Sequence, residues 1–161
     1  MPVSKPLMSA ARLSRLGFSI HLDPDGLMTV TPADQLTPEL TTTIRFWRND
    51  LAAELLMHDP QPIPWNEQVG EALIRRTAES FARLSWTEGI IPWAQTQAPE
   101  WWQRYVETES RIDTAFSARD MQALAYACRD WWNALRQLVT QHAQAQVTGP
   151  VARKEKELSH V

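Results

Sequence analysis

The feature of this sequence that most constrains its fold is a stripe of apolar residues in the C-terminal third of the chain. Apolar side chains recur there every three or four residues: Met121, Leu124, Ala125, Cys128, Trp131, Trp132, Leu135 and Leu138. This spacing predicts a long amphipathic helix whose apolar face is buried against other elements. Adjacent residues on a helix point about 100° apart, so at most one of Trp131 and Trp132 is expected to be fully buried.

Two further helical patterns precede this stripe. One extends from Asn66 to about Leu84 and the other begins at Pro99, and both carry apolar residues at helical spacing. The segment between them, residues 85–99, is predicted to be irregular. We therefore expect a Trp-rich helical unit of about three helices over residues 65–146, followed by a polar tail over residues 147–161.

The most unusual feature of the composition is its eight tryptophans among 161 residues. The simplest interpretation is that a small core uses large side chains to bury enough apolar area. The alternative is an exposed stacking or docking surface. The segment Trp101–Tyr105, which includes Arg104, has the composition of a surface that stacks on unpaired bases.

Residues 18–31 have the alternation of a β-hairpin. Apolar residues alternate with polar ones on both sides of a turn at residues 24–26: Phe18, Ile20 and Leu22 before it, Met28 and Val30 after it. A hairpin of two strands is marginal alone, so its apolar face must lie on helices. Four polar side chains then point outward, and we consider them candidate partner-binding residues: Ser19, His21, Thr29 and Thr31.

Helical patterns flank this hairpin. Residues 7–16 precede it, with Gly17 in the position of a left-handed C-cap. Thr37 caps a second helix, with proline and glutamate in its first turn, that continues to about Met57. The fold class is thus α+β and mainly α, with a helix–hairpin–helix module over residues 1–58 and a proline-rich linker over 59–64.

Residues that could carry chemistry do not form catalytic or metal-binding patterns. The four histidines occur singly, and no nucleotide-binding or nucleophile-elbow motif is present. Glu107, Glu109 and Asp113 could do acid–base work, but opposite Arg104 and Arg111 they are more typical of surface pairs four residues apart. We expect no catalytic residue, no metal and no cofactor, and therefore no enzyme.

Charge and cysteine content indicate the partners and the compartment. The formal net charge is −3, whereas proteins that hold DNA through its phosphates usually have a basic excess, so nucleic acid is not favoured. Cys128 is the only cysteine, which fits a reducing cytoplasm, and its place in the apolar stripe predicts a buried thiol. Without a signal sequence or a long apolar run, the chain is expected to be cytoplasmic and without a membrane partner.

Four short motifs in residues 7–57 occur in the order and spacing of a known family. They are Leu16-Gly17 before the first strand, Asp25-Gly26 at the turn, Leu36-Thr37-Pro38-Glu39-Leu40 at a helix start, and the closing run from Leu51 to Leu56. This segment resembles the TubC-type N-terminal docking domain of multidomain peptide and polyketide synthases. In that family a small αβ unit, often dimeric, receives the charged tail of the preceding enzyme on its hairpin. Similar segments also occur in small proteins of bacterial plasmids and other mobile elements.

The resemblance implies a recognition surface on residues 18–32, an adjacent helix that carries Arg45 and Arg48, and a homodimer formed through the N-terminal module. The expected function is that of a non-enzymatic bacterial adaptor that binds another protein, with a mobile element as one candidate origin. The alternative is an accessory protein of plasmid or mobile-element DNA metabolism that contacts nucleic acid or a replication enzyme. Arg45 and Arg48, one turn apart, either hold an acidic partner or belong to a solvated helix face.

Overall fold

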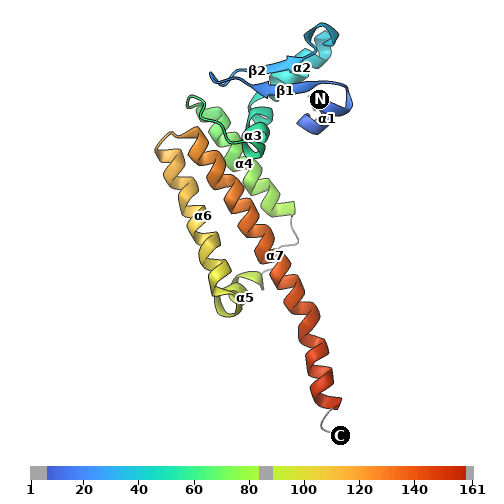
Figure 1. Cartoon of the computed structure of the whole chain (residues 1–161), viewed down its shortest axis with the longest axis vertical. Helices are drawn as coiled ribbons and strands as arrows, with labels where there is room; N and C mark the ends of the chain where they lie inside the picture. Colours follow the sequence, from blue (N-terminus) through green and yellow to red (C-terminus); the bar gives the residue numbers. More distant parts are fainter. Residues whose placement is uncertain (1–6, 84–88, 159–161) are drawn as a thin grey trace, which may run out of the picture.

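The protein is mainly helical and contains an antiparallel β-hairpin, which confirms the predicted fold class. The computed structural model describes residues 7–83 and 89–158, with side chains described in 7–80 and 89–148. Within these residues the hairpin and the first two helices lie at one end of an elongated molecule, and the C-terminal end of the last helix lies at the other (Figure 1). None of the described helices is both long and apolar enough to cross a membrane.

The hairpin forms as predicted. It follows α1 (Ala10–Arg15), and Gly17 after this helix has a φ of 91°, the left-handed conformation expected of its C-cap. Strand β1 (Ser19–Leu22) pairs with β2 (Met28–Thr31), with Ile20 opposite Val30. Phe18, Ile20 and Leu22 are buried, because this face of the hairpin lies on helices.

The prediction of one continuous helix from Thr37 to Met57 is wrong. After a short 3-10 helix (Ala33–Gln35), α2 (Pro38–Phe46) begins with the predicted cap, in which the Thr37 hydroxyl oxygen accepts the Leu40 N–H at 3.2 Å. The chain then turns at Trp47 and continues as α3 (Arg48–His58). No glycine or proline marks this break. It lets α2 pack on the hairpin while α3 packs on the helical bundle, so tertiary packing overrides local helix propensity.

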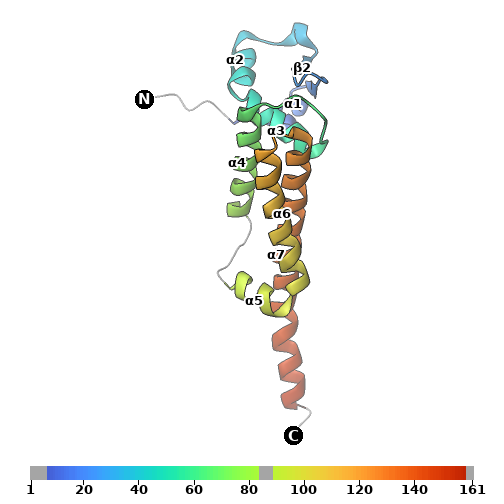
Figure 2. The ribbon, with the colours of Figure 1, turned by 90° about the vertical axis from the view of Figure 1, so that its left-hand side faces the viewer.

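The second half of the chain contains four described helices instead of about three. Long helices α4 (Glu67–Arg83), α6 (Pro99–Ser117) and α7 (Met121–Leu158) form a bundle, and α5 (Ile90–Gln97) crosses near its lower end (Figures 1 and 2). Helix α5 occupies part of the segment that we expected to be irregular. Pro92 is compatible with this helix because it falls in the first turn, where a missing N–H is tolerated. Trp86 lies outside the described residues.

Helix α7 also exceeds its predicted length. We expected a polar tail after residue 146, yet the helix continues through residues 149 and 150, a Gly-Pro pair, as far as Leu158. Its C-terminal part projects beyond the other helices in both views (Figures 1 and 2). Leu138 is the last buried residue in the described part of α7, so the helix continues well beyond its buried stretch.

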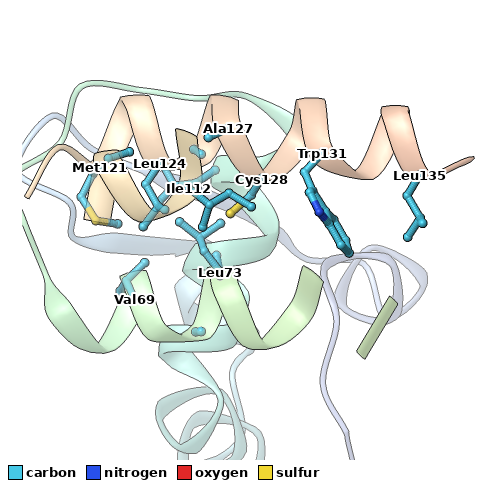
Figure 3. Packing of buried hydrophobic residues seen from close by; sticks show 14 of the residues in the cluster. Val69, Leu73, Ile112, Met121, Leu124, Ala127, Cys128, Trp131 and Leu135 are labelled. Carbon is cyan, nitrogen blue, oxygen red and sulfur yellow. The ribbon is translucent and has the colours of Figure 1, made fainter. Parts of the chain in front are cut away.

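The core has two hydrophobic clusters that meet at α3. The smaller one joins α1, the hairpin and α2, and it includes Leu51 of α3. The larger one fills the bundle, where Leu73, Ile112 and Leu124 pack together, and it includes Ala53 and Leu56 of α3 (Figure 3). No helix crosses the proline segment, but the core continues across it, so a division into two units at residues 59–64 stays a prediction.

Candidate functional site

The turn of the hairpin fixes the register of its strands. The Asp23 carboxylate accepts hydrogen bonds from the backbone N–H groups of Asp25 at 3.0 Å and Leu27 at 2.9 Å. Gly26 supplies the left-handed conformation of the turn, with a φ of 82°. The Asp23 N–H donates to the Leu27 carbonyl at 2.9 Å. Asp23 and Leu27 therefore form a hydrogen-bonded pair of the ladder.

This pair determines which backbone groups of β2 point outward. Hydrogen-bonded and non-hydrogen-bonded pairs alternate along an antiparallel ladder, so Met28 and Val30 belong to non-hydrogen-bonded pairs in the observed register. Their N–H and C=O groups point away from β1. Among the described residues, no other element makes a backbone hydrogen bond to these two residues. Within the part of the chain that the structure describes, the outer edge of β2 is thus open to a further strand.

A groove of about 310 Å³ lies beside this open edge, between β2 and α2. Its apolar lining comes from Met28 and Val30 of β2, from Leu36 just after the 3-10 helix, and from Ile44 of α2. Met28, Val30 and Leu36 are only half-buried, which leaves apolar surface accessible beside the unpaired backbone groups. The two elements that border the groove, β2 and α2, lie at the hairpin end of the molecule (Figure 2).

Arg45 and Arg48 both line this groove. The chain turn at Trp47 places Arg45 in the last turn of α2 and Arg48 at the start of α3, and both side chains are exposed. Neither arginine takes part in an ion pair with the described residues. A cation at a helix N-terminus faces the positive end of the helix dipole, so the position of Arg48 brings no stability from that source. The two charges are available to an anionic partner.

The six candidate residues proposed from the sequence do not form one site. The hairpin directs its four polar candidates outward, and all four are exposed: Ser19, His21, Thr29 and Thr31. They lie on the face opposite the side chains of Met28 and Val30, because successive residues of a strand point to opposite faces. The structure instead brings Arg45 and Arg48 together with the apolar lining of the groove.

Sequence reasoning missed the apolar half of the groove. Met28 and Val30 were expected only to continue the hairpin alternation, and Leu36 was noted only as part of a helix-start motif. No local signal in the sequence identifies these residues as the lining of a groove, because the groove forms only where α2 approaches β2 in the folded chain.

Other residues with potential chemistry are positioned for structural roles. Cys128 is fully buried, and burial raises the pKa of its thiol to about 11, although a hydrogen bond from the Thr77 hydroxyl acts in the opposite direction. A thiol with this pKa is almost wholly protonated at neutral pH and is a poor nucleophile. The described residues contain no group of histidine, cysteine, aspartate and glutamate side chains that could hold a metal ion.

The aromatic segment at residues 101–105 is largely occupied by internal contacts. Trp102 stacks on Tyr105, with ring centroids 5.5 Å apart, and Tyr105 is buried against Trp131. The Arg104 guanidinium lies 4.8 Å from the centroid of the Trp101 ring. These contacts fit the interpretation that the tryptophans mainly supply core area.

Comparisons with protein-family models, curated proteins and solved structures found no match to this chain.

Proposed function

We propose that this protein is a non-enzymatic binding module that holds an extended, acidic segment of another protein along β2. The observation that carries this function is the coincidence of three features: the open backbone edge of β2, the apolar groove next to it, and the two arginines of that groove. Each feature favours a different property of the same ligand.

An added strand would satisfy the outward N–H and C=O groups of Met28 and Val30. Alternate side chains of that strand point to the same face, so every second residue would enter the groove and contact Leu36 and Ile44. Carboxylates of the ligand would form charge-assisted hydrogen bonds with Arg45 and Arg48. The ligand class is therefore an extended peptide that combines apolar residues with acidic ones.

This function agrees with the type of surface that the sequence resemblance to docking domains leads us to expect. As part of the same proposal, the protein acts as a cytoplasmic adaptor in a bacterium, and we place its partner-binding surface on the groove side of β2. The polar face that carries His21 and Thr29 has a secondary role. It keeps the exposed side of the hairpin hydrated.

The test is a selection of linear heptapeptides from a random display library on the full chain and on the Arg45→Glu/Arg48→Glu variant. We expect the unmodified protein to enrich peptides that alternate apolar and acidic residues, and the variant to enrich basic peptides instead. The matched control is Arg15→Glu/Arg119→Glu, which reverses two exposed charges outside the groove. It should select the same peptides as the unmodified protein.

Equal enrichment on all three proteins would show that the two groove arginines do not select the ligand. Salt-sensitive retention of a single-stranded oligonucleotide, lost in the Arg45→Glu/Arg48→Glu variant, would favour the nucleic-acid alternative over a peptide ligand.

A further inference from the structure

A second surface lies in the bundle, where α4 and α6 both pack against α7 and leave a cleft between them. The cleft has a volume of about 220 Å³. Its walls are apolar and come from all three helices: Ile74 and Ala78 of α4, Ile112 of α6, and Trp131 of α7. Ile112 and Trp131 are part of the larger hydrophobic cluster (Figure 3).

Two carboxylates and the buried Thr77 complete the lining of this cleft. Glu109 and Asp113 are four residues apart on α6, so they share one face of the helix, and both are exposed. Two like charges at this spacing destabilise a helix slightly, so their placement brings no stability to α6. Burial, and to a smaller extent the negative charge of Glu109, raise the pKa of Tyr105, which lies one turn before Glu109 on α6.

The expectation that these acids form surface pairs with nearby arginines is wrong for the described residues. Arg111 pairs with Asp130 of α7 at 3.0 Å, and Arg104 lies over the Trp101 ring. Glu107 accepts a hydrogen bond from Gln103 at 3.0 Å. Neither Glu109 nor Asp113 belongs to an ion pair within the described part of the chain.

We propose that this cleft binds a lysine or arginine side chain of a partner protein segment. Both side chains combine an apolar stem with a charged head, and the cleft combines apolar walls with two carboxylates at its rim. The stem would lie against Ile74 and Ile112, and the charged head would reach Glu109 and Asp113. A volume of about 220 Å³ accommodates one long side chain and is too small for a whole helix.

This surface is independent of the β2 groove. The groove carries two arginines and favours an acidic strand, whereas the cleft carries two carboxylates and favours a basic residue. Different residues would hold the two ligands, so an experiment that contradicts one of the two binding sites leaves the other site unaffected.

The experiment titrates isotope-labelled full chain with an acetylated, amidated pentapeptide that has one central arginine among alanines. The same peptide with citrulline is the control, since citrulline has the shape of arginine without its charge. We expect a saturable shift of the Trp131 indole N–H signal, with binding roughly tenfold weaker for the citrulline peptide. Higher salt should weaken binding of the arginine peptide and leave that of the citrulline peptide unchanged.

Two double variants distinguish the effect of the cleft carboxylates on binding from the effect of other charges on α6. Glu109→Gln/Asp113→Asn should weaken binding of the arginine peptide to the level of the citrulline peptide. Glu100→Gln/Glu107→Gln removes two charges from the same helix outside the cleft and should leave binding unchanged. Equal shifts with both peptides, or no saturable shift with the arginine peptide, would overturn the proposal. Equally strong binding of free guanidinium ion would also contradict the proposal, because it would indicate that the ligand is a small cation and not a protein segment.

Discussion

At the scale of single residues, Trp131 and Trp132 show how position on a helix determines the role of a side chain. Trp131 is 7% exposed and contacts the Tyr105 ring, with centroids 5.8 Å apart, whereas Trp132 is half-buried near Arg136. We expect Trp131→Ala to lower the free energy of unfolding by about 3–5 kcal/mol and Trp132→Ala to lower it by clearly less. Urea unfolding of the two variants measures the difference. Equal and small losses would show that the apolar stripe is misassigned.

Cys128 provides a pH-dependent contribution to stability. Its pKa of about 11 in the folded protein exceeds the ordinary value of 9.0, because burial disfavours the thiolate. The unfolded chain therefore releases the proton first as the pH rises. The contribution is fully present below pH 9 and is lost between pH 9 and 11, by roughly 2–3 kcal/mol.

The measurement is urea unfolding of the protein and of Cys128→Ala below pH 9 and at pH 11. The variant lacks this titration, so we expect its stability to fall less over the same range. Tyr105, whose pKa is also raised, is present in both proteins and cancels in the comparison. Parallel losses in the two proteins would contradict a buried, protonated thiol.

At the scale of elements, α4 approaches its neighbours closely at Gly70. A Cβ at this position would lie 3.0 Å from the Trp65 ring, 3.3 Å from the Phe116 ring and 3.4 Å from Leu124. Trp65 and Phe116 pack edge to face, with centroids 5.2 Å apart. Gly→Ala in a helix interior usually raises stability by roughly 1 kcal/mol. Here we expect overpacking to reverse the sign and to give a net loss of about 1 kcal/mol.

Thermal unfolding of Gly70→Ala measures this effect, with Glu71→Ala as the control on the exposed side of the same helix. The control should change the midpoint little. A higher midpoint for Gly70→Ala would show that the contact between α4 and its neighbours is looser than described.

Elements with local signals were predictable from the sequence, and elements set by distant contacts were not. The hairpin was predictable because Asp23 and Gly26 determine its turn through contacts within a few residues. The break between α2 and α3 was not, since Trp47 carries no signal of a helix end. Only the separate packing of α2 and α3 explains it.

The candidate site was predictable only in part for the same reason. Arg45 and Arg48 were identified because the resemblance to docking domains implies a recognition helix after the hairpin, and these two like charges lie one turn apart on it. Leu36 and Ile44 could not be assigned to the same groove as Met28, because the approach of α2 to β2 is a tertiary contact. Alternation in the hairpin showed which residues face outward but not which side of β2 stays open.

At the scale of the whole molecule, α3 joins the hairpin to the bundle. Glu54 of α3 accepts the Ala10 N–H of α1 at 3.1 Å and lies 3.8 Å from the Arg76 guanidinium of α4. Asp50 pairs with Arg75 of α4 at 2.6 Å. One helix thus contacts both the N-terminal elements and the bundle with charged and apolar side chains.

Because α3 belongs to both clusters, we expect the hairpin and the bundle to unfold together. Urea titration followed by NMR should give the same midpoint for amide signals of β2 and of the buried part of α7. A lower midpoint for the β2 signals would instead support two independent units that meet at the proline segment.

The central claim is that β2 accepts a further strand at its outer edge. Amide hydrogen exchange of the full chain, with and without a selected acidic heptapeptide, tests it most directly, because the N–H groups of Met28 and Val30 point away from β1. Binding should slow exchange at Met28 and Val30 and leave Thr29, which already pairs with His21, unchanged. Binding without slower exchange at Met28 and Val30, or with slower exchange at Ile20 and Leu22 of β1 instead, would contradict the claim.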